Sequence, residues 1–303
     1  MLTILENSEF KLTIRPDLGG RIDQIVDQKT GHEWLWHPPG YDASQTRSLP
    51  VGAPFDENWS GGWDEMFPND GEGLSQNRHL VDHGELWSQA WDVVETTPSS
   101  IKMARFCETV PVSIQKTIRL EESQARIEFQ FHNKSDEAIP FLFKHHVAIV
   151  IEAGDEILLP DCLIEPVALG FSKIIGRAQK THFPKAFAAD GQEVDLRKTL
   201  PRSSQSQEFF YSSNLAKGEC GIRNQRSGSA LMMTFDQTDF PYVWVLQSYG
   251  GWRDHYVLVM EPCTTIPYDL DVACQNGTAA QLKPKELQHR TLTIHLQRSV
   301  DNK

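Results

Sequence analysis

The chain has 303 residues, of which 39% are hydrophobic and 23% are charged. This composition is typical of a water-soluble globular protein and excludes a disordered or collagen-like chain. The formal net charge is −12 at pH 7, from 29 Lys and Arg against 41 Asp and Glu. Because polyanions repel a negatively charged protein, we expect neither nucleic acid nor an anionic membrane as a partner.

The N-terminal residues and the cysteines indicate the compartment. The sequence opens without a basic segment and without a long apolar segment, so it predicts no secretory signal. The longest largely apolar stretch, residues 138–151, is interrupted by Lys144, His145 and His146 and is too short to span a bilayer. The five cysteines are odd in number and form no C-x-x-C pair, which is typical of reduced thiols. The sequence therefore predicts a cytoplasmic protein.

Short segments in which apolar and polar residues alternate recur from one end of the chain to the other. In chain order they lie at residues 10–15, 101–104, 114–120, 127–131 and 292–296. They are rich in β-branched or aromatic residues, and turn-forming residues follow them. Such strands, joined by tight turns, predict an antiparallel meander that forms a sandwich or barrel.

The signals for helices and for domain boundaries are weak. No window of about a dozen residues keeps a clean 3.6-residue period with caps at both ends. No repeat and no low-complexity linker divides the chain. We therefore expect an all-β fold with few short helices, in a single domain that spans residues 1–303. Two irregular stretches, residues 37–80 and 162–218, interrupt the meander, and such segments are often functional or mobile.

Aromatic residues gather in one part of the chain. Four of the eight tryptophans lie within residues 59–91, namely Trp59, Trp63, Trp87 and Trp91. Aspartates, glutamates and histidines lie among them. Indole rings that stack on sugar C–H surfaces, with polar groups that reach hydroxyls, would suit a carbohydrate pocket. The alternative is that these tryptophans fill the core of the sandwich.

Three positions combine a titratable side chain with an unusual local sequence. His83 precedes Gly84, where the backbone can turn and present the imidazole. Successive side chains of a strand face opposite sides, so only one of His145 and His146 can point into a given pocket. Glu261 ends an apolar strand just before a proline, where a carboxylate is costly to bury unless it is paired or used.

Each of these positions also has a structural interpretation. His83 could cap a loop, and either histidine of the 144–146 segment could be a core residue with its hydrogen bonds satisfied. Glu261 could form an ion pair with Arg253 or Lys144.

Metal and cofactor motifs are missing from the sequence. The histidines and acidic residues offer possible metal ligands, but no H-x-H pair of the cupin kind occurs. The motifs G-x-G-x-x-G, G-x-x-x-x-G-K-[ST], G-x-S-x-G and H-E-x-x-H are also absent. We therefore predict no metal and no cofactor, with a metal-dependent sugar isomerase as an alternative.

Several motifs occur in the order in which one family of enzymes carries them. They are LGGRI at 18–22 with DQKTGHEW at 27–34, SGGWDEMFP at 60–68, DHGELW at 82–87, FKHHVA at 143–148 with GDEILLP at 154–160, and LVMEPCT at 258–264. They resemble the opening hairpin, the glycine-containing loops, the histidine strand and the glutamate strand of the aldose 1-epimerases, or galactose mutarotase-like proteins. The chain is therefore similar to a divergent branch of that family.

The resemblance implies a fold, an activity and the roles of three residues. The fold would be a large antiparallel β supersandwich, and the activity would be cofactor-free interconversion of the α and β anomers of a sugar. Glu261 would be the general base at the C1 hydroxyl, His146 the general acid at the ring oxygen, and His83 would steady the transition state. Residues 144, 146 and 148 share one face and match the family's K-x-H-x-A spacing, whereas His145 shares its face with Phe143 and reads as core.

The sugar itself is not identified by these motifs. The N-R-I and N-H-x-Y-F-N motifs of the best-known galactose mutarotases are absent, and so are clear counterparts of their substrate-binding arginine and aspartate. We predict that Trp63, Asp64, Lys144 and Arg253 bind the substrate. Lys144, Arg253, Arg177 or Lys173 could also pair with a phosphate, so a phosphorylated or sulfonated sugar stays open.

The expected partner is a small-molecule sugar, bound by a monomer or a homodimer. A non-catalytic carbohydrate-binding protein on the same fold is the alternative from another functional class.

Overall fold

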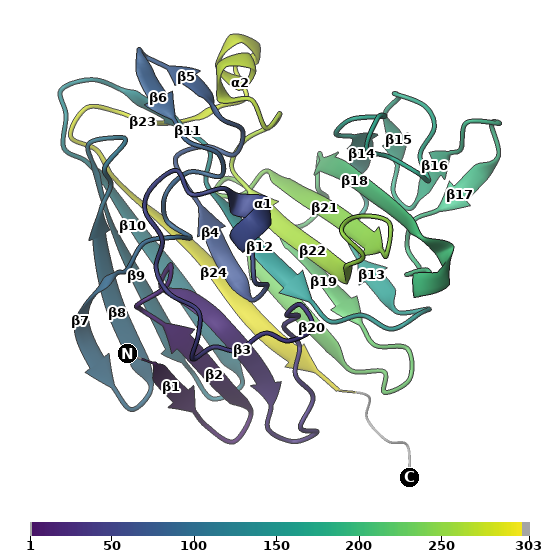
Figure 1. Cartoon of the computed structure of the whole chain (residues 1–303), viewed down its shortest axis with the longest axis horizontal. Coiled ribbons are helices and arrows are strands. Elements are labelled where there is room, and N and C mark those ends of the chain that lie inside the picture. Colours follow the sequence, from purple (N-terminus) through teal and green to yellow (C-terminus); the bar gives the residue numbers. More distant parts are fainter. Residues whose placement is uncertain (1, 299–303) are drawn as a thin grey trace.

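The computed structural model describes residues 2–298, and its main feature is a pair of large antiparallel sheets (Figure 1). The strand order in the ten-stranded sheet is β1 (Thr3–Glu6), β2 (Phe10–Arg15), β3 (Arg21–Asp27), β4 (Trp63–Met66), β12 (Lys144–Ile149), β22 (Tyr256–Cys263), β21 (Tyr242–Tyr249), β18 (Ser206–Ser213), β14 (Leu163–Pro166) and β15 (Thr181–His182). The order in the eight-stranded sheet is β13 (Glu156–Leu158), β19 (Glu219–Arg223), β20 (Ala230–Phe235), β24 (Leu287–Gln297), β10 (Gln124–Asn133), β9 (Val112–Leu120), β8 (Ser100–Phe106) and β7 (Asp92–Thr97).

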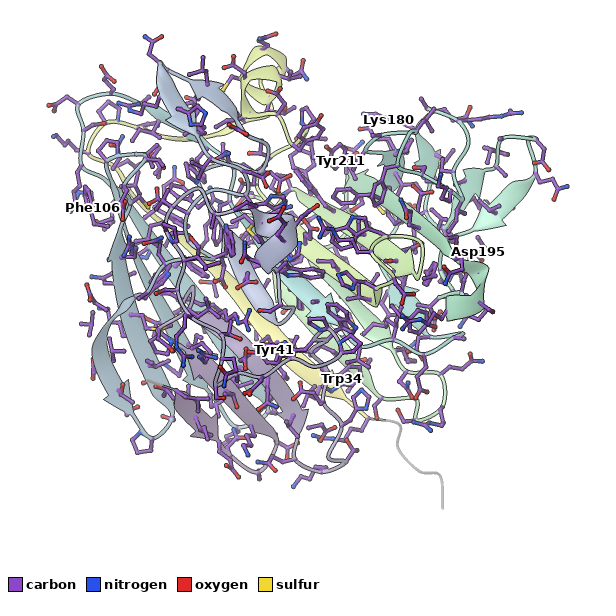
Figure 2. All side chains as sticks on the ribbon, in the orientation of Figure 1. Trp34, Tyr41, Phe106, Lys180, Asp195 and Tyr211 are labelled. Carbon is purple, nitrogen blue, oxygen red and sulfur yellow. The ribbon has the colours of Figure 1, made fainter. Side chains whose placement is uncertain are left out.

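The smaller elements lie around these sheets, and α1 lies over the ten-stranded sheet (Figure 1). They are the strand pairs β5 (Gly73–Ser75) with β6 (Arg78–Leu80), β11 (Ile139–Phe141) with β23 (Ala280–Leu282), and β16 (Lys185–Phe187) with β17 (Glu193–Asp195), the helices α1 (Phe55–Asn58) and α2 (Leu270–Asn276), and the 3₁₀ helix η1 (Arg202–Ser204). Lys180 and Asp195 mark the extension built around β14 to β17 (Figure 2). The predicted all-β fold with few short helices is confirmed, and the five predicted segments correspond to β2, β8, β9, β10 and β24.

The alternating sequences form strands because their apolar side chains share the face between the sheets. In β10, Ile127, Phe129 and Phe131 are buried while the residues between them are only partly covered. Phe129 and Phe131 pack against Phe143, which directly precedes β12 of the ten-stranded sheet. One hydrophobic cluster thus extends across both sheets.

The central strands of the ten-stranded sheet are buried on both faces. All six residues of β12 are buried, and so are all residues of β22 except Tyr256. The face turned away from the eight-stranded sheet packs against a second cluster, composed of Trp36, Phe55, Trp59, Met66, Trp87, Ala148, Leu246, Val257 and Val259. In Figure 1, α1 lies in front of β4 and β12 on this face. Polar residues of β12 and β22 on this outer face are therefore shielded from water without belonging to the main core.

A polar network crosses the main core behind this region. The Lys116 ammonium of β9 lies 2.7 Å from both carboxylate oxygens of Glu65 on β4 and 3.0 Å from the Gly20 carbonyl oxygen. The Trp63 indole donates to His145 Nδ1 at 3.1 Å. Burial lowers the pKa of His145, which keeps its imidazole neutral. In residues 2–298, no helix has both the length and the apolar character needed to cross a membrane.

Candidate active site

The strand register brings distant residues into one row on the outer face of the ten-stranded sheet. Asp64 of β4 lies opposite His146 of β12, and Trp244 of β21 lies opposite Glu261 of β22. The register of β12 against β22 also places His146 beside Glu261. Residues directly opposite each other in antiparallel strands share a face. The row therefore contains one imidazole between two carboxyl groups.

The charge at the centre of the row comes from a lysine shared by two carboxylates. The Lys144 ammonium lies 2.6 Å from Asp70 Oδ1 and 2.6 Å from Glu261 Oε2, and 4.4 Å from the centre of the Trp244 ring. Burial alone would lower the pKa of Lys144, but the two carboxylates raise it above its ordinary value. Lys144 is therefore a permanent cation, held in place by its partners.

Glu261 and His146 are the two neighbouring side chains whose types suit acid–base chemistry. His146 Nε2 lies 3.8 Å from Glu261 Oε1, and both side chains are buried. Burial raises the pKa of Glu261, and the Lys144 ammonium opposes this effect. Burial, and then the charge of Lys144, hold the pKa of His146 well below its ordinary value. In this covered arrangement the imidazole is neutral.

His83 joins the cluster from a tight turn. Its backbone adopts the left-handed conformation with φ 57°, and Gly84 follows with φ 63°. Only glycine fits at residue 84, because a Cβ there would lie 2.2 Å from the Phe67 carbonyl oxygen. The His83 ring bonds to Asp82 Oδ1 through Nδ1 at 2.9 Å, and its Nε2 lies 3.7 Å from Asp70 Oδ1.

Aromatic side chains from residues 52–61, which we call the cover segment, close the site. Phe55 and Trp59 meet the His146 ring edge to face at centroid distances of 5.4 and 5.2 Å, and Phe55 also stacks on His83 at 4.0 Å. Trp59 is only 7% exposed, and its indole nitrogen has no hydrogen-bond partner within residues 2–298. The cover segment begins and ends at glycines with positive φ, Gly52 and Gly61.

Trp63, a predicted substrate-binding residue, does not lie with the other predicted site residues. Trp63 lies opposite Val147, so it shares the face of His145 and points into the core between the sheets. It is fully buried there, and its indole nitrogen is used by His145. The reason is the two-residue period of β4, which turns Trp63 and Glu65 inward and Asp64 outward.

The other predicted binding residues lie on the outer face or at its margin. Asp64 is buried beside Arg21, whose Nη1 lies 3.9 Å from Asp64 Oδ2, and burial raises the pKa of Asp64 to about 7. Arg253 is 42% exposed and pairs with Asp56 of the cover segment at 3.5 Å. Lys144 contacts carboxylates of the protein itself. The structure therefore brings His146, Glu261, Lys144 and His83 together, with Asp64 opposite His146 on the neighbouring strand and Arg253 at the exposed margin.

Two parts of the site were missed by sequence reasoning. Asp70 follows the SGGWDEMFP motif in a stretch recognised only as irregular, and the cover residue Phe55 precedes that motif. A carboxylate close after a family-like motif was the available signal. Its partner Lys144 lies far away in sequence, and only the adjacency of β4 and β12 brings the two together.

Within residues 2–298, no group of three or more His, Cys, Asp or Glu side chains has an arrangement that could hold a metal ion.

The chain is a β supersandwich with a buried cluster of His, Lys, Asp and Glu side chains on one sheet. Residues 78–296 match the family described as "Domain of unknown function (DUF4432)", and the chain belongs to it. The comparison with curated proteins gives no match.

Solved structures with similar folds include galactose mutarotase-like proteins. The Slr1438 protein of Synechocystis sp. PCC 6803 is 15% identical with a TM-score of 0.74, over 99% of this chain and 96% of that chain. A galactose mutarotase related enzyme of Lactobacillus acidophilus is 16% identical with a TM-score of 0.70, over 99% of both chains. A galactose mutarotase-like protein of Lactobacillus casei ATCC 334 is 15% identical with a TM-score of 0.69, over 98% of this chain and 100% of that chain. At these identities the similarity establishes the fold.

Proposed function

We propose that this protein is a cofactor-free aldose 1-epimerase that interconverts the α and β anomers of a sugar. The observation that carries the proposal is the 3.8 Å separation of His146 Nε2 and Glu261 Oε1 on a buried face, beside the Lys144 ammonium. Anomer exchange requires one proton to leave the C1 hydroxyl and another to reach the ring oxygen. A carboxylate and an imidazole at this spacing can serve both oxygens of one hemiacetal.

In the proposed reaction Glu261 takes the proton from the C1 hydroxyl, and His146 gives a proton to the ring oxygen. The bond between C1 and the ring oxygen breaks, leaving an open-chain aldehyde. After rotation about the C1–C2 bond the ring oxygen attacks the other carbonyl face. As the ring closes, the attacking hydroxyl returns its proton to His146, and Glu261 gives its proton back to the C1 oxygen, so the protein ends in its starting state. His83 hydrogen-bonds the sugar from the side of Asp70.

The cover segment has to move for this reaction to begin. Phe55 and Trp59 occupy the space over His146, so a sugar reaches the imidazole only when their rings withdraw. Replacing those rings with sugar hydroxyls reduces the burial that keeps His146 neutral, and a protonated imidazole then becomes accessible. The free indole nitrogen of Trp59 can donate to a hydroxyl, and its ring can pack on the C–H surface of the sugar.

The charges of the site favour a neutral sugar. The single ammonium of Lys144 is shared by the carboxylates of Asp70 and Glu261, which leaves this group with a net negative charge. A phosphate or sulfonate placed here would meet two carboxylates for one cation.

Exchange spectroscopy provides the test. Saturation transfer between anomeric proton signals should reveal faster exchange for at least one member of a panel of free sugars and sugar phosphates. Glu261→Gln should reduce that rate by about 100-fold or more, as expected for a lost general base. His145→Asn is the matched control on the opposite face of β12 and should keep most of the rate per folded molecule. No exchange with any sugar, or full exchange in Glu261→Gln, would contradict the proposal.

A non-catalytic carbohydrate-binding protein is the second candidate. The observation in its favour is the neutral, aromatic-covered state of His146. Saturable binding of a sugar without any change in its anomer exchange rate would support this function instead.

A further inference from the structure

Lys144, Glu261 and Asp70 form a charge cluster, in which Asp70 is the residue to which neither the sequence nor the resemblance gives a role. Its side chain is 10% exposed, and its Oδ1 lies 2.6 Å from the Lys144 ammonium, the same distance as Glu261 Oε2. Lys144 is therefore bound equally closely by the candidate base and by a second carboxylate. If Lys144 served only to neutralise Glu261, the second carboxylate would add nothing.

We propose that Asp70 is a positioning residue for the proposed reaction, which orients the Lys144 ammonium and sets how strongly Glu261 holds a proton. The role of Asp70 in catalysis rests on the proposed function, whereas its effect on the protonation of Glu261 does not depend on any reaction. Lys144 keeps the buried carboxylate ionised. Asp70 takes up part of the lysine charge and thereby keeps Glu261 a strong enough base to remove a hydroxyl proton.

The charged and titratable groups that face Glu261 come from three parts of the chain. Lys144 and His146 project from β12. Asp70 lies in the segment after β4, and His83, with Asp82 on its other nitrogen, lies in the 81–84 turn. Of these groups only Lys144 directly contacts both carboxylates. The competition between the two carboxylates for one ammonium is therefore the direct route by which Asp70 acts on Glu261.

Neutralising Asp70 and neutralising Lys144 should shift the protonation of Glu261 in opposite directions. Asp70 carries the same charge as Glu261, so its neutralisation should make Glu261 harder to protonate and a weaker base. Lys144 carries the opposite charge, so its neutralisation should make Glu261 easier to protonate. If Asp70 had only a structural role, both substitutions would loosen the site and would shift the protonation of Glu261 in the same direction.

The test is an NMR titration of the Glu261 carboxyl carbon in protein labelled with ¹³C at glutamate Cδ, with Glu261→Gln used to assign the signal. Relative to the unmodified protein, the titration midpoint should fall in Asp70→Asn and rise in Lys144→Met, each by about one pH unit or more. Asp70→Glu should keep the Glu261 midpoint near that of the unmodified protein, because it retains the negative charge. Asp82→Asn is the matched control, since Asp82 pairs with His83 rather than Lys144, and it should shift the midpoint clearly less.

The activity measurement separates this inference from the proposed function. If the anomers of a sugar are exchanged, the acid limb of the pH–rate profile should move to lower pH in Asp70→Asn and to higher pH in Lys144→Met. Asp70→Asn should also lower kcat more than it changes KM. If no sugar is exchanged, the proposed function fails while the titration still decides the role of Asp70. Unchanged midpoints, or midpoints that move together in Asp70→Asn and Lys144→Met, overturn the inference. Asp70→Ser replaces Asp70→Asn if thermal unfolding shows that the asparagine variant does not fold.

Discussion

Replacing Lys116 with methionine should strongly destabilise the protein, although Lys116 is remote from water and from the proposed sugar site. Lys116 and Glu65 are fully buried, and the ammonium lies 2.7 Å from both carboxylate oxygens. Methionine fills a similar volume but removes the charge, so Glu65 is left unpaired in the main core. Breaking one side of a buried pair typically costs about 3–5 kcal/mol.

This cost is measurable by calorimetry. At roughly 2–3 °C per kcal/mol for a chain of this size, the melting temperature should fall by about 6–15 °C. The double variant Lys116→Met with Glu65→Met removes both charges and should recover most of the loss, because an apolar pair can replace a buried ion pair without a penalty. Urea unfolding monitored by tryptophan fluorescence provides an independent free energy of unfolding.

The result that would refute this reasoning is a Lys116→Met variant within about 1 kcal/mol of the unmodified protein, against the expected 3–5 kcal/mol. Such a result would mean that Glu65 does not stay an unpaired buried carboxylate, either because it takes up a proton or because water reaches it. A double variant that is no more stable than the single one would also contradict the argument. In that case the loss would come from packing rather than charge.

Two further predictions concern the residues around His146. Because burial holds the pKa of His146 well below 6.5, the unfolded chain binds a proton below pH 6.5 that the folded chain does not. Stability should therefore fall as the pH drops below 6.5, by up to about 1.4 kcal/mol per pH unit for this group. The raised pKa of Glu261 acts in the opposite direction at lower pH. His146→Gln should reduce the slope measured by urea unfolding between pH 7 and 5, and equal slopes would contradict the prediction. Trp59→Phe should weaken binding of the preferred sugar about fivefold, the value of one hydrogen bond near 1 kcal/mol, as measured by calorimetric titration. Trp63→Phe should leave that affinity unchanged and lower the melting temperature, and the reverse pattern would show that the two indoles were assigned to the wrong faces.

Local sequence patterns predicted the strands because each pattern depends on neighbours in the chain. The alternation at residues 114–120 and 127–131 corresponds to β9 and β10, which pair along nearly their whole length. The same two-residue period predicted that His145 and His146 face opposite sides, and the structure places them in the core and beside Glu261 respectively. Their chemical roles stay predictions.

The remainder of the candidate site depends on contacts between distant segments. The link from Asp70 to Lys144 exists only because β12 lies between β4 and β22 in the sheet. The cover segment has little regular structure, so no periodicity indicated that Phe55 would stack on His83. Trp63 lies apart from Trp59 because Trp63 belongs to β4 and points into the core, whereas Trp59 precedes that strand and belongs to the cover segment.

The two faces of β12 show why a run of three polar residues can lie in a fully buried strand. A buried polar group destabilises the fold unless it has a partner, and here each face provides partners of a different kind. On the core face His145 accepts from the Trp63 indole beside the Lys116–Glu65 pair. On the outer face Lys144 is held between two carboxylates, while His146 Nδ1 has no hydrogen-bond partner within residues 2–298. On the core face His145 Nε2 also has no hydrogen-bond partner among the described residues, so unused hydrogen-bonding capacity does not separate the two faces. The difference is the charge: the core face holds one ammonium with one carboxylate, whereas the outer face holds one ammonium between two carboxylates.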